Sequence, residues 1–403
     1  MSKLKSVTDA LHEIKSNITP LAAKKVPIAQ ALGAILQEDV IAGTHHPLSD
    51  MSAMDGYGVR SIDALKGAVL NIVGESAAGH PYRQPLEKGQ AVRIYTGGYA
   101  PEGCDAIILQ EEVEDASETI IVPEDISAGR FIRKRGQDFC RDDILIAKGD
   151  TLTPRGLALS SLGLQSQVSA IQNPKIAILS SGDELVSAGA LPRFGQLVNS
   201  NSVFLKAALT SFGAEVTDLG ILPDKEGALL DALSTDDKYD LIVTTGGASV
   251  GKYDYIVSDL EQQSDMSLNF WKIAMRPGKP LIFGAIGDVP LIGLPGNPVS
   301  VAVCTFVFLM PVIGHMMQRD DLQLITLPAV CEASLPANDQ REDYLRAVAT
   351  CKDGQWHVKP FDSQDSAQLR HLSNANAFLI RPAFDKPIAK GEIVKMALIP
   401  AGC

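Results

Sequence analysis

The chain has 403 residues, of which 45% are apolar and 21% charged, and its formal net charge is -12. This composition excludes a disordered chain, and the length predicts about two to four domains at ~100–200 residues each. The negative charge argues against general binding to nucleic acid or to anionic membranes, because both attract cationic surfaces.

The sequence also carries signals about the compartment. The segment Met1–Asp9 is polar and lacks the apolar core of a signal peptide. The apolar run Val299–Gly314 is shorter than the ~18–20 residues of a membrane span, and Pro311 interrupts its end, so we expect a buried helix. The six cysteines are scattered without a CxxC pair, which favours free thiols in a reducing compartment. These features predict a cytoplasmic protein.

The first stretch of the chain, to about Ala42, is predicted to begin with a helix that Ser6 caps and Pro20 ends. From about Gly43 to Gly136, short strand-like runs separated by Gly and Pro indicate a small all-β unit. These runs are Val69–Val73, Ala91–Ile94, Ala106–Leu109 and Ile120–Val122. From Asp143 the pattern returns to mixed structure, with Thr151-Leu-Thr-Pro154 leading into a helix. The β unit therefore resembles an insertion into an outer domain.

The third stretch, about Pro174 to Arg319, alternates apolar strands with helices, which indicates a mostly parallel sheet covered on both faces. The expected strands are Lys175–Leu179, Glu215–Leu219, Leu241–Thr244, Phe270–Ile273, Leu281–Phe283 and Pro290–Leu294. The expected helices are Val203–Phe212, Lys225–Leu233 and one from Val299. The fourth stretch, Leu324 to Cys403, is rich in strand-like runs and predicts a small β-barrel or sandwich.

Three glycine-containing loops follow strands of the predicted sheet, at the ends where such sheets bind ligands. They are Ser180–Glu184, Gly246–Gly251 and Leu294–Pro298. Glycine lets backbone N–H groups approach a ligand closely, and a helix start offers free N–H donors to an anion. A shared pocket is favoured over three unrelated turns. The chain has no Walker A sequence and no GxGxxG signature, which argues against ordinary kinases, GTPases and dehydrogenases.

Charged residues accompany these loops. The acidic ones are Asp183, Glu184, Asp224 and Asp254. Carboxylates beside phosphate-binding loops suit Mg²⁺, whereas the alternative for each residue is helix capping. The basic ones are Lys272, Arg276 and Lys279, which fall within one strand-to-turn passage. In an acidic protein such a concentration suits an oxyanion or a phosphate, and the alternative is a solvated surface.

Five motifs in order carry a family resemblance: Ser52-Ala-Met-Asp-Gly-Tyr57, Ser181-Gly-Asp-Glu-Leu185, Gly246-Gly-Ala-Ser-Val-Gly251, Arg276-Pro-Gly-Lys-Pro280 and Leu294-Pro-Gly-Asn-Pro-Val-Ser300. The chain closely resembles the molybdopterin molybdenumtransferase family, which includes the bacterial MoeA proteins and the gephyrin E-domain. The resemblance implies an α/β multidomain protein with an elongated N-terminal domain (1–42 and 143–173) and an inserted β-rich domain (43–142). It also implies an α/β molybdopterin-binding domain (174–322) and a C-terminal β-barrel (323–403).

The resemblance implies that adenylated molybdopterin and molybdate give molybdenum cofactor and AMP, with Mg²⁺ as cofactor, in a homodimer. Asp55 and Thr96 would line the cleft from the partner subunit. Asp183 or Glu184, Asp224 and Asp254 would hold the metal and the pyrophosphate bridge. The attacking group would be either a metal-bound water or an oxygen of molybdate. The residues expected to bind substrate are Gly246, Gly247, Ser249, Gly251, Lys272, Arg276, Lys279, Pro295, Pro298, Ser300, Arg346 and Ser366.

The chain departs from the family pattern at three places that concern the site, and one of them, Arg276 where some members have Lys, keeps the charge. The family often has Thr-Gly-Ala-Pro where this chain has Thr96-Gly-Gly-Tyr99, and Asp362 stands where a family glycine is expected beside Ser366. Two other functions remain open: a molybdopterin adenylyltransferase and a non-catalytic scaffold of the gephyrin type. Tungstate is an alternative oxyanion. A molybdopterin adenylyltransferase and other proteins of the cofactor pathway are expected partners, and neither nucleic acid nor membrane is expected.

Overall fold

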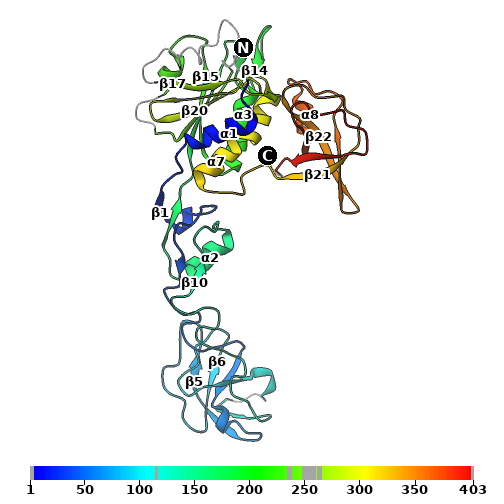
Figure 1. Ribbon diagram of the computed structural model, residues 1–403. Coiled ribbons are helices and arrows are strands. Elements are labelled where there is room, and N and C mark those ends of the chain that lie inside the picture. Colours follow the sequence, from blue (N-terminus) through cyan, green and yellow to red (C-terminus); the bar gives the residue numbers. More distant parts are fainter. Residues whose placement is uncertain (1–3, 114–116, 234–237, 247–259, 261–265, 401–403) are drawn as a thin grey trace. The chain divides into compact units, whose positions relative to one another are not determined.

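The structure is a computed structural model that describes residues 4–400 except 114–116, 234–237, 247–259 and 261–265. The chain divides into two compact units, one of Met1–Ala22 with Ile171–Cys403 and one of Ala23–Ala170 (Figure 1). The smaller unit is therefore inserted into the sequence of the larger one. Each unit has its own hydrophobic core, and the two are described separately below.

A six-stranded sheet in the order β15-β12-β16-β20-β19-β17 forms the centre of the larger unit. Its first four strands are parallel, β19 is antiparallel to β20, and β17 is antiparallel to β19. The bounds are β12 Lys175–Ser181, β15 Glu215–Leu222, β16 Leu241–Thr245, β17 Met266–Trp271, β19 Ile282–Ile286 and β20 Val289–Leu294. The mostly parallel sheet is thus confirmed. Continuous burial of β16 explains why its sequence, Leu-Ile-Val-Thr-Thr, begins with three apolar residues and contains no charged one.

Helices of the larger unit pack beside this sheet in two core clusters, with α4 in the smaller of the two. Their bounds are α1 Val7–Ser16, α3 Ser200–Ser211, α4 Ala228–Ala232, α6 Pro298–Cys304, η4 Thr305–Leu309, α7 Met310–Met317 and α8 Leu369–Ser373. Ser6 caps α1 by accepting from Asp9 N at 3.1 Å, as its sequence predicts. The helix α3 begins before the predicted Val203 because Asn199 caps it, accepting from Ser202 N at 3.3 Å.

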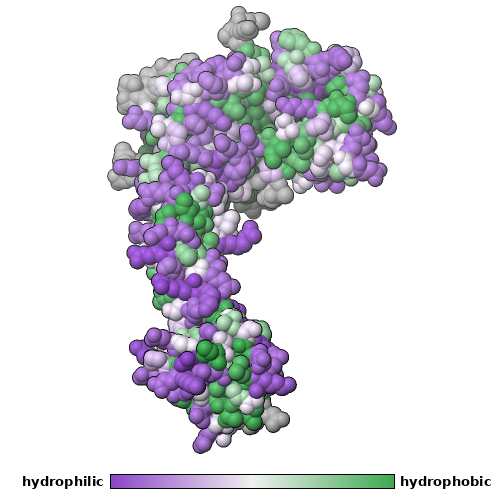
Figure 2. Space-filling view, turned by 60° about the horizontal axis from the view of Figure 1, so that its bottom comes forward, coloured by the Kyte–Doolittle hydropathy of each residue, from purple (hydrophilic) through white to green (hydrophobic). Residues whose placement is uncertain are grey.

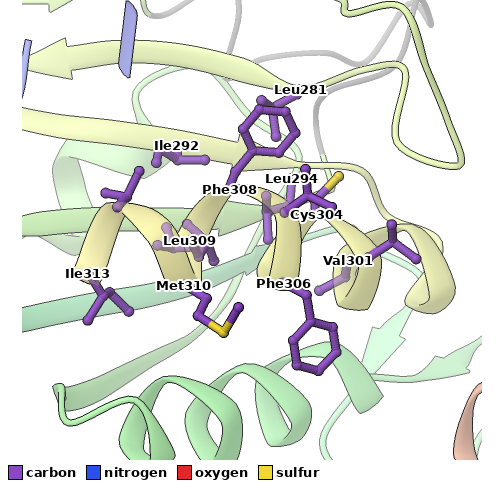
Figure 3. Close-up of a cluster of buried hydrophobic side chains, with 14 of the residues drawn as sticks. Leu281, Ile292, Leu294, Val301, Cys304, Phe306, Phe308, Leu309, Met310 and Ile313 are labelled. Carbon is purple, nitrogen blue, oxygen red and sulfur yellow. The ribbon is translucent and has the colours of Figure 1, made fainter. Parts of the chain in front are cut away.

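The segments α6, η4 and α7 form one helix through the core (Figure 3). Among the described residues this helix is the one candidate long and apolar enough to span a membrane, but 94% of its apolar window is buried inside the protein. Leu294 and Ile292 of the sheet lie against it, and Phe308 and Cys304 fill the space between. The buried helix is confirmed, and it continues past the predicted Gly314 to Met317. The π-helical segment η4 directly precedes α7, and Pro311 lies in the first turn of α7.

The C-terminal part of the larger unit is a closed barrel rather than a sandwich. Its strands follow the order β22-β23-β21-β25-β24, and β24 pairs again with β22. The bounds are β21 Thr326–Cys331, β22 Glu342–Lys352, β23 Gln355–Pro360, β24 Ala377–Arg381 and β25 Ile393–Leu398. The short strand β18, Met275–Arg276, adds to β22 in parallel and ties the α/β part to the barrel. Short strands β13 Leu185–Val186 and β14 Leu197–Val198 form a separate pair.

The smaller unit contains a five-stranded sheet in the order β7-β4-β6-β5-β8. Its bounds are β4 Gly56–Val59, β5 Val69–Ser76, β6 Gln90–Ile94, β7 Ala106–Leu109 and β8 Thr119–Ile121, of which the last four match the predicted runs and β4 was not predicted. The remaining elements are β1 Ala23–Pro27, η1 Ile28–Gln30, β2 Val40–Ile41, β3 Met51–Ser52, η2 Ser61–Asp63, η3 Gln110–Glu112, β9 Ile132–Arg133, β10 Ile144–Ile146, α2 Pro154–Leu162 and β11 Gln167–Ile171. Thr153 caps α2, as predicted. On the face in Figure 2, hydrophobic residues of each unit lie in small groups among hydrophilic ones.

Candidate functional site

The loops predicted to bind a ligand lie at one edge of the six-stranded sheet. This edge carries the carboxyl ends of the parallel strands β15, β12, β16 and β20. Because β19 runs antiparallel, its start lies at the same edge, and so does the end of β17. The residues placed at this edge are Asp224, Gly182, Asp183, Gly246, Pro295, Pro298, Lys279 and Lys272. The topology therefore brings the three glycine loops to one location.

The β12 and β15 end of this edge is acidic. Asp183 Oδ1 accepts from Asp224 N at 3.1 Å, and Asp224 Oδ2 accepts from Asp183 N at 3.4 Å. Ser181 Oγ donates to the other Asp224 oxygen at 2.8 Å. These reciprocal bonds join the loop after β12 to the loop after β15. Glu184 follows and is exposed. Hard oxygen donors of this kind fit Mg²⁺, which uses a few carboxylates together with phosphate oxygens and water.

The middle of the edge is built from glycine because the loops approach each other closely. Gly246 has φ +81°, and a Cβ added there would lie 2.3 Å from the carbonyl oxygen of Ser181. A Cβ on Gly296 would lie 3.7 Å from the Cα of Gly246. Asn201 Nδ2 donates to Gly296 O at 2.8 Å, which fixes that loop to α3. Bare backbone therefore faces the space where a ligand would lie.

Gly246→Ala is expected to destabilise the larger unit by about 2–4 kcal/mol, because it adds a steric clash to a left-handed backbone. Gly220→Ala is the matched control, since Gly220 has φ +91° with nothing within 4 Å of an added Cβ. It should lose only about 1 kcal/mol. Urea unfolding of both variants makes the comparison, and equal losses would contradict the close approach at Gly246.

The β19 and β17 end of the edge is basic. Lys279 is exposed at the start of β19, and Lys272 follows β17. The Lys272 backbone has φ +84°, a region that residues other than glycine rarely adopt and that is often found at functional sites. Four strand spacings separate β15 from β19, which is roughly 19 Å at ~4.8 Å per strand. The edge thus offers separate acidic and basic ends to an elongated anionic ligand.

Arg276 lies beside this basic end but has partners of its own. Its guanidinium forms a close ion pair with Asp343, a second with Asp339 at 3.3 Å, and a hydrogen bond to Asn338 Oδ1 at 3.1 Å. The bond to Asp343 is the main factor that raises the pKa of Arg276. Burial raises the pKa of Asp343, and Arg276 opposes that change. Much of the Arg276 charge is therefore used to join β18 to the barrel.

Arg346 of β22 is the least satisfied cation in the described part of the chain. It is fully buried, yet its Nε and Nη1 atoms have no hydrogen-bond partner among the described residues. Nη2 donates to Ser363 O at the long distance of 3.4 Å. Burial lowers the pKa of Arg346, and the nearby charge of Asp365 acts in the opposite direction. A buried cation with two unused donors is unfavourable unless an anion binds there.

The loop beside Arg346 also contacts the start of the core helix. Asn297 Nδ2 donates to Ser366 Oγ at 3.0 Å, and Val299 N donates to Ser366 O at 3.2 Å. Ser300, in the first turn of α6, is 4% exposed. Ser366, Ser300 and the Pro298 start of the helix therefore lie together. Asp362 and Asp365 are both exposed, and Asp365 is the carboxylate whose charge acts on Arg346.

Asp55 and Thr96 lie together in the smaller unit. Asp55 Oδ1 accepts from the Thr96 amide at 2.6 Å and from the Thr96 hydroxyl at 2.8 Å. These two bonds lower the pKa of Asp55, and the charge of Arg93 adds to them. The second glycine of the loop is needed locally, because a Cβ on Gly98 would lie 2.6 Å from Ser76 O. The two turn-like segments of this unit thus form one polar cluster.

Four predicted site residues, Gly247, Ser249, Gly251 and Asp254, lie outside the described residues. Within the described ranges, no group of three His, Cys, Asp or Glu side chains is arranged to hold a metal ion. Of the predicted metal ligands, Glu184 and Asp224 lie in the described part of the chain and Asp254 does not. The binding of a metal ion by these three residues therefore stays a prediction. Asn297, Gln364 and Asp365 were not predicted. Asn297 stands just before a helix, which is a usable signal, whereas nothing local marks Gln364 or Asp365.

Family profiles match nearly the whole chain. Residues 5–163 match the MoeA N-terminal region (domain I and II), and residues 177–315 match a probable molybdopterin binding domain. Residues 328–399 match the MoeA C-terminal region (domain IV). The profiles follow the order of the motifs in the sequence, and together they include both units of the structure.

Individual relatives are similar over their full length. The molybdopterin molybdenumtransferase of Haemophilus influenzae is 35% identical over 93% of this chain and 93% of its own. Molybdopterin molybdenumtransferase 2 of Mycobacterium tuberculosis is 33% identical over 91% and 92%. A crystal structure of the molybdopterin biosynthesis MoeA protein from Pyrococcus horikoshii has a TM-score of 0.80 at 27% identity, covering 98% and 99% of the two chains. The predicted fold is confirmed by these matches.

Proposed function

The chain belongs to the molybdopterin molybdenumtransferase family, and from that premise we propose that it inserts molybdate into adenylated molybdopterin and releases AMP. The observation that carries the proposal is the single sheet edge with acidic and basic ends, beside the buried and unsatisfied Arg346. One reactant is an elongated phosphorylated molecule and the other is a small dianion. A site for both requires a cation-rich end and an oxyanion pocket next to each other.

Each end of the edge has a chemical part in this proposal. Lys272 and Lys279 neutralise phosphate groups, while the loops at Gly246 and Pro295 hold the ligand through their backbone. Arg346, Ser366 and Ser300 hold molybdate where the dithiolene sulfurs of the pterin reach molybdenum. An oxygen from molybdate or water attaches to the adenylyl phosphorus. The P–O bond between that phosphorus and the pterin phosphate breaks, and AMP leaves. Charge neutralisation and positioning supply most of the catalysis in such reactions, so no protein thiol is needed.

Mg²⁺ is part of the proposal as a cofactor held by Asp224 and Glu184, or by Asp183, together with Asp254. When bound, it would offset the negative charge of the phosphoanhydride. The support is the chemistry of the donors, since Asp183 and Asp224 already lie within hydrogen-bond reach of each other's backbone. A cytoplasmic homodimer, in which Asp55 and Thr96 of a partner subunit complete the cleft, belongs to the same proposal.

The experiment that tests the function gives the purified chain adenylated molybdopterin, molybdate and Mg²⁺ and follows AMP. We expect AMP release that depends on molybdate. Release of pyrophosphate from ATP and molybdopterin, without molybdate-dependent AMP, would favour a molybdopterin adenylyltransferase. Absence of both reactions would favour a scaffold of the gephyrin type. Tungstate in place of molybdate tests the oxyanion preference.

Asp365→Asn is expected to lower the KM for molybdate by about 2- to 5-fold, because it removes a charge that repels a dianion bound by Arg346. The asparagine keeps the oxygen that accepts from Ala367 N at 2.8 Å, so the loop should hold its shape. Asp362→Asn is the control, since Asp362 is exposed in the same loop. Initial rates of AMP release against molybdate give both constants. A KM that is unchanged or raised in Asp365→Asn would contradict an oxyanion at Arg346.

A further inference from the structure

The Gln364 side chain connects the strand of Arg346 to the loop of Ser366. Its Oε1 accepts from Arg346 N at 2.9 Å, and its Nε2 donates to Arg346 O at 3.0 Å. The same Nε2 donates to Phe361 O at 2.9 Å. The amide is therefore bonded both to the backbone of the cation that the proposed oxyanion needs and to the beginning of the neighbouring loop.

The position of this amide follows from where the β-ladder ends. The strands β22 and β23 pair from Lys352↔Gln355 to Ala347↔Pro360. The next pair would be Arg346 and Phe361, and Phe361 N does donate to Arg346 O at 3.0 Å. The returning bond, from Arg346 N to Phe361 O, is replaced by the Gln364 amide, which bonds to both groups. Gln364 thus separates the loop from the strand by the width of an amide group.

This separation bears directly on Arg346. The loop that Gln364 holds away from β22 contains Ser363, whose carbonyl oxygen is the one protein acceptor that the Arg346 guanidinium reaches among the described residues. Two residues after Gln364, Ser366 contacts the start of α6 through Asn297 and Val299. The distance between Arg346 and Ser366 is therefore set from both ends, by the amide on one side and by the helix start on the other.

We infer that Gln364 is a positioning residue for the oxyanion: it touches neither reactant, but it holds the loop of Ser363 and Ser366 at the distance from Arg346 that an oxyanion requires. The inference rests on the proposed function, because it presumes molybdate at Arg346. Hydrogen bonds to a small ligand weaken steeply with distance and angle, so a loop that moves toward the guanidinium lowers oxyanion affinity while leaving the pterin loops unaffected.

A second side-chain amide, that of Asn376, bonds to β22 three residues beyond Arg346, at Ala349, and provides a matched control. Asn376 Oδ1 accepts from Ala349 N at 2.7 Å, and its Nδ2 donates to Ala349 O at 2.9 Å. This amide bonds the backbone of the same strand in the same way, but it holds a residue outside the candidate site. Loss of either amide removes a similar pair of bonds from the barrel. Only loss of Gln364 should change the oxyanion pocket.

The test compares Gln364→Ala and Asn376→Ala in the full chain by calorimetric titration with molybdate and by the kinetics of AMP release. We expect Gln364→Ala to raise the molybdate Kd and KM by about 10-fold or more, with the KM for adenylated molybdopterin within about 2-fold of wild type. Asn376→Ala should leave the molybdate constants unchanged. Gln364→Asn, which keeps a shorter amide, should be intermediate and serves if the alanine variant folds poorly.

The inference is overturned if Gln364→Ala and Gln364→Asn bind molybdate as wild type does, or if Asn376→Ala weakens binding equally. Titration needs no turnover, so it separates the inference from the proposed function. A wild-type chain whose molybdate affinity depends on Gln364 but that releases no AMP would leave the positioning role intact and end the transferase proposal.

Discussion

Arg346→Met is expected to make the chain more stable and at the same time unable to use molybdate. The native side chain is fully buried with two donors unpartnered among the described residues, so replacing it by an apolar side chain of similar length removes an unfavourable term. We expect a gain of about 1–3 kcal/mol in the free energy of unfolding. Residues held in an unfavourable state for function give this opposition between stability and activity.

The loss of kcat/KM for molybdate in Arg346→Met, expressed as a free energy, should exceed the gain in the free energy of unfolding. Two charge-assisted hydrogen bonds to a dianion correspond to about 3–4 kcal/mol together, or roughly 10²- to 10³-fold in kcat/KM for molybdate. The measurement pairs urea unfolding with rates of AMP release across a range of molybdate concentrations. Arg346→Lys, which keeps a charge without the planar fork, should recover only part of the activity.

Arg381→Met is the control for a buried arginine that is satisfied. Arg381 is 3% exposed and donates to Pro336 O at 2.6 Å, Lys386 O at 2.9 Å and Asp385 at 3.2 Å. Its replacement should destabilise the barrel and leave the molybdate KM unchanged. If Arg346→Met also destabilised the chain and kept its molybdate KM, Arg346 would be a structural residue and the oxyanion pocket would lie elsewhere.

Asp224→Asn is expected to lower the rate of AMP release by about 10²- to 10³-fold, or ~3–4 kcal/mol, while the chain stays folded. The asparagine is isosteric, and its oxygen can still accept from Ser181 Oγ, which lies 2.8 Å from Asp224 Oδ1. The variant loses one negative charge at the acidic end of the edge, together with the weak acceptor that Asp224 Oδ2 offers to Asp183 N at 3.4 Å. The apparent Mg²⁺ requirement should therefore shift to higher concentration, which rates measured over a Mg²⁺ titration will show.

Asp218→Asn provides the comparison for Asp224. Asp218 lies on the same strand, β15, and its carboxylate also accepts from a backbone amide, Gly220 N at 2.9 Å. It is not at the carboxyl edge, so its substitution should leave both the rate and the Mg²⁺ requirement unchanged. Wild-type rates and an unaltered Mg²⁺ dependence in Asp224→Asn would remove Asp224 from the metal set and leave it as a loop-fixing residue.

The inner strands β12 and β16 could be predicted because burial on both faces gives each of them a continuous run of apolar residues. Local patterns left the choice between barrel and sandwich open, since it depends on the pairing of β24 with β22, and only the family resemblance implied the barrel. The core helix could be predicted as far as Gly314, across Pro311, and it continues to Met317. In this helix the π-helical segment η4 precedes α7, and the apolar surface of the sheet holds both segments in place.

The site was predictable to the extent that charge and glycine mark loops at strand ends. Sequence spacing shows that Arg276 and Lys279 are close together, but the carboxylates that pair with Arg276 come from 63 and 67 residues further along the chain. The same limit applies to Arg346, whose lack of partners is a property of the folded barrel. The position of Gln364 depends on where the hydrogen-bonded pairing of β22 with β23 ends. That end point exists only in the folded barrel and leaves no local signal in the sequence.

The most direct measurement of the central claim is the amount of AMP released and of molybdenum retained by the pterin, determined in one sample of wild-type protein with and without molybdate. The site described above predicts about one AMP for each molybdenum inserted, and almost no AMP when molybdate is left out. AMP released at the same rate without molybdate would show that the two anions do not share one edge of the sheet.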